Sequence, residues 1–135
     1  MALITWTDSL SVGVESIDNQ HTVLFNTINE LHTAMMKGQG RAKVGELLCT
    51  LLAYTRSHFL DEETLMENAK YAGLATHRIE HRNLTKQVEE YERRYQQGDL
   101  TLSLELADFL SNWLKKHIQS VDQSYKPWLN EHGVY

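Results

Sequence analysis

Apolar residues recur at intervals of three and four along four stretches of this 135-residue chain. In the first stretch, at about residues 18–37, the repeat is carried by Val23, Leu24, Ile28, Leu31 and Met35. A period near 3.6 indicates a helix with one apolar face, which must be buried against other elements. The same pattern predicts further helices at about residues 41–68, 74–97 and 102–121.

Short polar or glycine-containing links, such as "KGQGR" and "GDLT", separate the four stretches. We expect Asp18 or Ser16 to cap the first helix and Asp99 or Thr101 to cap the fourth. Four helices of about 20 residues with short links predict an all-α, up-down-up-down four-helix bundle. We expect a single domain over residues 1–135, with an extended N-terminal arm (1–17) and a short C-terminal tail (122–135).

Composition and charge argue against several functions. The net charge is −5 with acids and bases interleaved, so no basic footprint for nucleic acid is present. No apolar run reaches the roughly 18 residues of a membrane span, and "MALITW" lacks the features of a signal peptide. The lone Cys49 excludes an internal disulfide and fits a reducing cytoplasm. We expect a cytoplasmic monomer, because each predicted helix already has a partner for its apolar face.

Histidines and acids interrupt the apolar faces of these helices. In "HFLDEETLM", His58 and Glu62 are four residues apart, on one helix face and beside apolar residues. A charged pair is costly to bury unless something compensates it, and a metal ion is one such thing. In "HRIEH", His77 and His81 have the same spacing.

Antiparallel order predicts that these groups meet at one end of the bundle. His21 lies near the start of the first helix, and His117 lies late in the fourth. The full set is His21, His58, Glu62, His77, His81, His117 and Asp122. Five imidazoles and two carboxylates exceed the four ligands of one tetrahedral zinc, so the set suits two ions with bridging carboxylates. Imidazole binds Zn, Cu, Fe and Ni, so the metal is left open.

The spacing of five between His117 and Asp122 needs a local distortion. On a regular α-helix these residues diverge by roughly 140°. We therefore predict either a helix end or a π-bulge between them. Each histidine feature also has a simpler reading as a surface or capping group, but those readings give no reason for all of them to share one layer. His32 and His132 lie outside the layer and are interpreted as surface residues.

The combined motifs "W…LSVGVESIDNQH", "HFLDEETLM", "HRIEH" and "WLKKHIQSVDQSY" resemble the hemerythrin family, specifically its single-domain bacteriohemerythrins. The resemblance covers nearly the whole chain. It implies a non-haem di-iron centre that binds O2 reversibly, for storage, delivery or sensing. One departure is Ala72, where many relatives have proline; it affects the stiffness of a loop and no ligand.

The resemblance also implies a role for each site residue. One iron would be held by His77, His81 and His117, and the other by His21 and His58. Glu62 and Asp122 would bridge the two ions beside a solvent-derived oxo or hydroxo group. The ion with two imidazoles would keep an open position for O2.

Reversible binding requires a dry pocket, because water and protons promote oxidation of the iron. The residues expected to form this pocket are Leu24, Phe59, Trp113, Leu114, Ile118 and Tyr125. Tyr125 is also expected to close the site or to hydrogen-bond near it. Ligand imidazoles usually donate their second N–H to an acceptor, for which Glu63, Asp18 and Glu80 are candidates.

Three other functions could use the same residues. A di-iron oxidase, peroxidase or nitric oxide reductase would carry out chemistry at the open position. We nevertheless expect no catalytic side chain and no enzyme activity beyond side redox reactions. A sensor module would need a separate output partner, just as an O2 carrier could have a protein recipient. A zinc-only structural bundle would lack a visible chromophore.

Overall fold

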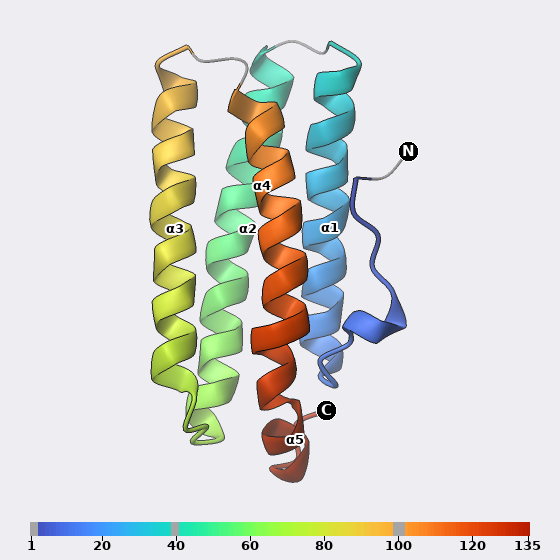
Figure 1. Cartoon of the computed structure of the whole chain (residues 1–135), viewed down its shortest axis with the longest axis vertical. Helices are drawn as coiled ribbons and strands as arrows, with labels where there is room; N and C mark the ends of the chain where they lie inside the picture. Colours follow the sequence, from blue (N-terminus) through green and yellow to red (C-terminus); the bar gives the residue numbers. More distant parts are fainter. Residues whose placement is uncertain (1–2, 39–40, 99–101) are drawn as a thin grey trace.

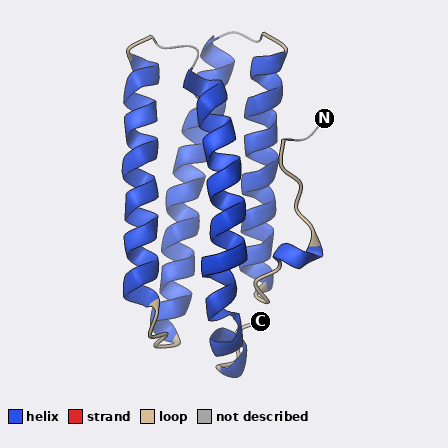
Figure 2. Cartoon of the chain, in the orientation of Figure 1, coloured by secondary structure: helices blue, strands red, loops and turns tan. Residues whose placement is uncertain are grey.

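Four long helices lie side by side in the computed structural model, which describes residues 3–38, 41–98 and 102–135. They are α1 (Glu15–Met36), α2 (Arg41–Asn68), α3 (Leu74–Gln96) and α4 (Leu102–His117). Each runs antiparallel to the helix before it in the chain (Figure 1). The described ranges contain no β-strand (Figure 2). The predicted all-α four-helix bundle is therefore confirmed.

The first helix begins earlier than predicted, at Glu15. Val14 is its N-cap residue and makes no capping hydrogen bond through its side chain. Asp18 instead accepts hydrogen bonds from the Val12 N–H at 2.9 Å and the Ser11 hydroxyl at 2.6 Å. The prediction that Asp18 or Ser16 caps this helix was wrong, because Asp18 ties down the preceding arm. The expected caps Asp99 and Thr101 lie outside the described residues.

The segment before α1 packs along the bundle as an arm with one 3-10 turn, η1 (Asp8–Leu10). Leu10, Val12 and Val14 are buried. Gly13 has a φ of +73°, a conformation that favours glycine, and a Cβ at this position would lie 2.9 Å from the Lys126 side chain. The glycine therefore lets the arm turn tightly against the C-terminal segment.

The C-terminal residues are more ordered than a tail. A π-helical turn, η2 (Ile118–Asp122), follows α4, and α5 (Gln123–Glu131) follows that. The Gln123 and Asn130 side chains donate hydrogen bonds to the Ser11 and Gly13 carbonyls at 2.7 and 3.0 Å. The helical backbone therefore continues beyond the predicted end at about residue 121, and the tail prediction missed α5, whose burial of Tyr125 and Leu129 gives it a tertiary reason to form.

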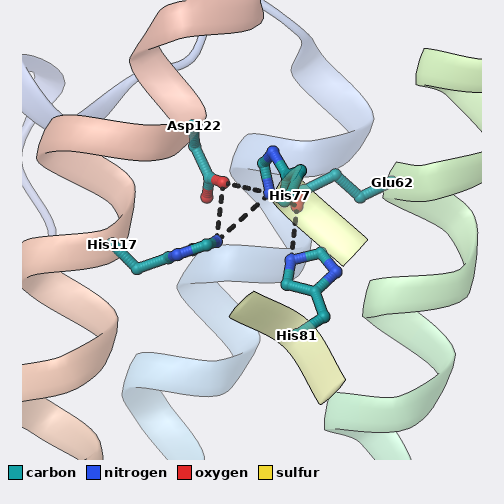
Figure 3. Close-up of side chains that lie close together, drawn as sticks. All are labelled: Glu62, His77, His81, His117 and Asp122. Carbon is teal, nitrogen blue, oxygen red and sulfur yellow. Dashed lines mark hydrogen bonds and ion pairs between the residues drawn. The ribbon is translucent and has the colours of Figure 1, made fainter. Parts of the chain in front are cut away.

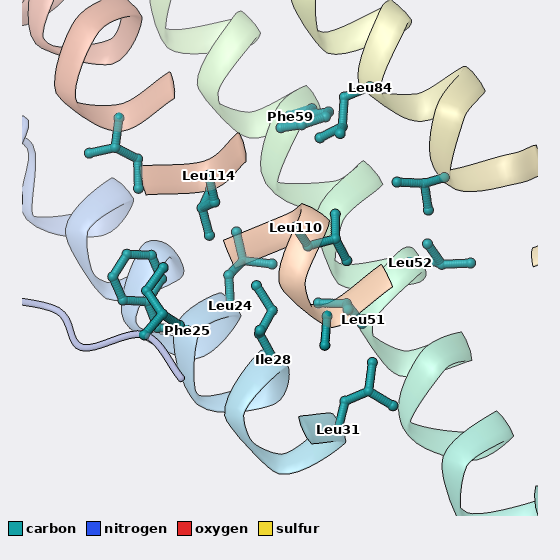
Figure 4. Close-up of a cluster of buried hydrophobic side chains, with 14 of the residues drawn as sticks. Leu24, Phe25, Ile28, Leu31, Leu51, Leu52, Phe59, Leu84, Leu110 and Leu114 are labelled. Carbon is teal, nitrogen blue, oxygen red and sulfur yellow. The ribbon is translucent and has the colours of Figure 1, made fainter. Parts of the chain in front are cut away.

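The apolar faces of the four helices meet along the bundle axis (Figure 4). Side chains at the centre of this core include Leu24, Ile28, Leu51, Leu84, Leu110 and Leu114. None of the described helices is both long and apolar enough to cross a membrane. Toward the end where α1 begins, the core changes from apolar side chains to histidines and carboxylates.

Candidate metal centre

All seven side chains singled out from the sequence gather at this end of the bundle, and each is at most 4% exposed. The helices α1 and α2 contribute His21, His58 and Glu62, while α3, α4 and η2 contribute His77, His81, His117 and Asp122. The structure thus brings the predicted ligand set together in one buried layer. The role of these residues as ligands stays a prediction.

Five of them form one group, the three-imidazole cluster: Glu62, His77, His81, His117 and Asp122. Nε2 of His77 lies 2.9 Å from Glu62 Oε1 and 2.9 Å from Asp122 Oδ1 (Figure 3). Nε2 of His81 lies 3.1 Å from Glu62 Oε1, and Nε2 of His117 lies 3.0 Å from Asp122 Oδ1. Neighbouring atoms that bind one ion at about 2.1 Å lie roughly 3 Å apart, which these separations match.

A second group, the two-imidazole cluster, contains His21, His58 and again Glu62. Nε2 of His21 lies 3.8 Å from Glu62 Oε2 and 3.4 Å from Asp122 Oδ2. Nε2 of His58 lies 3.7 Å from Glu62 Oε2. This group is looser than the first.

The two carboxylates join the clusters in the same way. Glu62 directs Oε1 toward the three-imidazole cluster and Oε2 toward the two-imidazole cluster. Asp122 divides Oδ1 and Oδ2 between the clusters likewise. A carboxylate that offers one oxygen to each of two positions has the geometry of a bridge between two ions.

Buried polar atoms without partners give the clearest reason to place cations here. Within the described residues, hydrogen-bond geometry is lacking at His81 Nε2, Glu62 Oε1, both oxygens of Asp122 and the two ring nitrogens of His21, even where the atoms are close, as His81 Nε2 and Glu62 Oε1 are at 3.1 Å. Buried polar groups are normally satisfied, and each exception needs an explanation. Metal coordination would supply it, and nitrogen with oxygen donors suits iron among several metals.

The distorted turn between His117 and Asp122 is the π-helix η2. Its wider turn allows two residues five apart to face the same cluster. The prediction of a helix distortion at this spacing is therefore confirmed, in its π-bulge form.

Burial and charge act in opposite directions on the imidazoles. Burial lowers the pKa of His58 to about 4, although Glu62 works against this. Burial also lowers the pKa of His77, but Asp122 and Glu62 outweigh it and raise the pKa to about 10. Burial would raise the pKa of Glu62, yet its imidazole neighbours hold it at about 2. Without a metal, His77 is therefore an imidazolium that compensates the two buried carboxylates.

Acceptors behind the imidazoles differ from the prediction. Glu63 accepts a hydrogen bond from His81 Nδ1 at 2.8 Å, as expected. Glu80 lies 3.9 Å from His117 Nδ1, beyond hydrogen-bond distance, and Asp18 bonds to the arm, so these two candidates were wrong. Sequence reasoning missed Gln20, whose Oε1 lies 2.6 Å from His58 Nδ1. Gln20 carries no charge, so nothing in the sequence distinguishes its amide from those of other polar surface residues.

Aromatic rings cover two of the imidazoles. Phe59 stacks on His81 with ring centroids 3.7 Å apart, and Trp113 stacks on His117 at 4.3 Å. A cavity of about 20 Å³ beside them is lined by Leu24, Phe59, Trp113 and Leu114, together with Ile28, Leu51, Thr55, Leu84 and Leu110. This is close to the space of one water molecule, in an apolar lining.

The other two pocket candidates lie elsewhere. Ile118 and Tyr125 are buried but do not line that cavity. The Tyr125 hydroxyl donates a 2.9 Å hydrogen bond to Glu62 Oε2, so its expected bond near the site is present. His32 and His132 lie outside both clusters.

Comparison with known proteins gives one consistent family. The model of the family described as "Hemerythrin HHE cation binding domain" matches residues 12–129. A bacteriohemerythrin of Stenotrophomonas maltophilia is 42% identical over 132 residues, which cover 98% of this chain and 85% of the relative. One from Pseudomonas aeruginosa is 41% identical over 125 residues, covering 93% and 80%. A crystal structure of wild-type hemerythrin superposes with a TM-score of 0.89 at 33% identity, covering 95% of this chain and 98% of its own.

Proposed function

Because the chain belongs to the hemerythrin family, we propose that it binds O2 reversibly at two iron ions held by the seven side chains of the metal centre. The observation that supports this most strongly is the division of Glu62 and Asp122 between two clusters of imidazoles. If only one metal ion were bound, the imidazoles of the other cluster would be buried with no ion to coordinate.

The two positions would have unequal coordination. His77, His81 and His117 would hold one iron, and His21 and His58 the other, with Glu62 and Asp122 shared. The position with one imidazole fewer would leave room for a small ligand on its ion. When bound there, iron would supply the electrons that O2 accepts reversibly.

The chain itself controls geometry and water. Tyr125 holds Glu62 by a hydrogen bond to Oε2, and burial raises the pKa of its hydroxyl well above the usual value, so the group stays a donor. Phe59 and Trp113 cover the imidazoles of His81 and His117 with apolar rings. This apolar lining would keep water and protons away from the site. Water and protons would otherwise let O2 leave in a reduced form, with the iron left oxidised.

We further propose that the chain acts as a monomer in the cytoplasm, as a store, carrier or sensor of O2. The lone Cys49, exposed on α2, fits a reducing compartment. Of the six candidates for the pocket lining, Leu24, Phe59, Trp113 and Leu114 would form the pocket itself, and Ile118 and Tyr125 would act from outside this cavity.

Uptake of O2 by the iron-loaded, reduced protein tests the proposal. We expect two irons per chain and one O2 taken up per two irons, released again under vacuum. His77→Ala should abolish this uptake, whereas His32→Ala, a matched control outside the clusters, should leave it unchanged. Two irons with no uptake would contradict the proposed function, and one iron per chain would contradict the proposed centre.

A further inference from the structure

Two of the imidazoles, one in each cluster, are held from behind by acceptors of different charge. In the three-imidazole cluster, His81 Nδ1 lies 2.8 Å from Glu63 Oε2, a carboxylate. In the two-imidazole cluster, His58 Nδ1 lies 2.6 Å from Gln20 Oε1, a neutral amide. Nδ1 of His21 and of His117 has no hydrogen-bond partner among the described residues. His81 in one cluster and His58 in the other are thus each fixed by a residue outside the cluster.

The amide of Gln20 is oriented by a third residue. Its Nε2 donates a 2.9 Å hydrogen bond to Asp61 Oδ2. An ionised carboxylate only accepts, so the amide nitrogen faces Asp61 and the amide oxygen faces His58. His58 must then carry its proton on Nδ1, which leaves the Nε2 lone pair directed into the cluster.

The carboxylate of Glu63 is oriented in a similar way. Arg78 donates from Nε to Glu63 Oε1 at 3.1 Å and from Nη2 to Glu67 Oε2 at 3.2 Å. Oε2 of Glu63 stays available to accept the Nδ1 proton of His81, so the Nε2 lone pair of His81 also faces the cluster. A carboxylate behind an imidazole makes the imidazole a more basic ligand, and it brings a negative charge that an amide lacks.

We infer that Glu63 and Gln20 are positioning residues that make the two metal positions unequal in affinity. The carboxylate-backed position, at the three-imidazole cluster, fills first and holds its ion more tightly. The amide-backed position fills second and empties first, so the open site is also the more weakly held one. This inference rests on the proposed pair of ions and adds the order in which they bind.

The three-imidazole cluster should bind metal more tightly than the two-imidazole cluster because it has one more imidazole. The experiment must therefore change only the residues that accept the Nδ1 hydrogen bonds of the imidazoles. Glu63→Gln makes the acceptor of His81 neutral. Its matched control is Glu67→Gln, which removes the same charge from the Arg78 network without touching an imidazole. The double variant Gln20→Glu/Asp61→Asn exchanges amide and carboxylate while the net charge stays the same. Its control is Asp61→Asn alone.

Titration of each metal-free protein with Co²⁺ in the absence of O2 measures both binding steps through visible absorption. For the wild type we expect two steps. Glu63→Gln should weaken the first step on the order of tenfold, the usual size for a residue behind a metal-bound histidine, and leave the second nearly unchanged. The exchange variant should tighten the second step relative to Asp61→Asn.

A second measurement separates positioning from loss of fold. The proton signals of Nδ1–H groups on imidazoles that bind Co²⁺ are shifted far outside the normal range. Glu63→Gln should move the signal of His81 and leave that of His58 in place. Glu67→Gln should move neither signal.

The inference is overturned if Glu63→Gln weakens both steps equally, or if the exchange variant binds its second ion no more tightly than its control. Those results leave the proposed function intact, because two ions still bind. A wild-type protein that binds only one Co²⁺ overturns both the inference and the two-ion centre.

Discussion

The hydroxyl of Tyr125 donates a hydrogen bond of 2.9 Å to Glu62 Oε2, which links α5 to the middle of the metal centre on α2. Both side chains are at most 1% exposed. The same oxygen faces His21 and His58, so Tyr125 fixes the carboxylate on the side of the two-imidazole cluster. The C-terminal helix is thereby part of the site.

Tyr125→Phe removes this bond and leaves a buried carboxylate oxygen with one donor fewer. Hydrogen bonds to charged groups contribute about 1.5–3 kcal/mol, so we expect the free energy of unfolding of the metal-free protein to fall by that amount in urea denaturation. Tyr71→Phe is the control, because it removes a hydroxyl from the neighbouring ring that packs edge-on against Tyr125 and leaves the bond to Glu62 in place. An equal loss in both variants would show that removal of a hydroxyl in this region, and not loss of the bond to Glu62, causes the effect.

The π-helical turn η2 gives a prediction about chain length. Deletion of the exposed Gln119 shortens the spacing between His117 and Asp122 to four, at which a regular α-helix keeps both on one face. Insertion of one alanine after Gln119 gives a spacing of six and turns Asp122 away. We expect the deletion to retain two metal ions per chain and the insertion to lose at least one, as measured by metal analysis. If both variants lost metal ions equally, the π turn would not serve to direct His117 and Asp122 toward the same cluster.

The metal-free protein should be most stable near pH 6.5, the ordinary pKa of histidine. The pKa of His58 is lowered to about 4 by burial, so the unfolded chain takes up a proton that the folded chain does not as the pH falls from 6.5 to 4. The pKa of His77 is raised to about 10 by Asp122 and Glu62, which overcome its burial. The folded chain then keeps a proton that the unfolded chain releases as the pH rises from 6.5 to 10. Stability falls in both directions.

Urea denaturation between pH 4 and pH 10 measures this profile. His77→Gln should remove the decline on the alkaline side and leave the decline on the acidic side, because His58 is unchanged. A wild-type stability that keeps rising from pH 6.5 to 9 would contradict the assignment of an imidazolium to His77.

Phe59 gives a prediction that separates dryness from stability. Phe59→Ala should cost about 3–5 kcal/mol of unfolding free energy and should let water reach His81, so the reduced, iron-loaded protein should oxidise faster in air. Phe25→Ala is the control: Phe25 is equally buried but does not line the apolar cavity. It should cost a similar free energy with no change in oxidation rate. Equal acceleration in both variants would assign the effect to loosened packing in general.

Much of the fold follows from the sequence, because its determinants are periodic. The apolar repeat places α2 at Arg41–Asn68 and α3 within one residue of its observed end. The layer of seven polar side chains follows from helix period and antiparallel order together. The bulge at η2 follows from one spacing that a regular helix does not allow.

The failures share a physical cause, since each depends on a tertiary contact that has no period. Asp18 has the composition of a helix cap, but the arm folds back and takes its carboxylate. α5 is short and contains Pro127, and buried Tyr125 and Leu129 hold it in place rather than a long apolar repeat. Gln20 precedes a ligand candidate as an ordinary polar residue, and only the packing of α1 on α2 shows that it faces His58.

An optical titration shows whether the two clusters form one reversible O2 site. The reduced, iron-loaded protein is moved from argon to air and back while its visible absorption is recorded over several cycles. We predict a colourless protein that gains visible bands in air and loses them when O2 is removed, with little decline between cycles. Bands that form once and persist under argon, or two irons per chain with no visible change in air, would contradict reversible O2 binding at this centre.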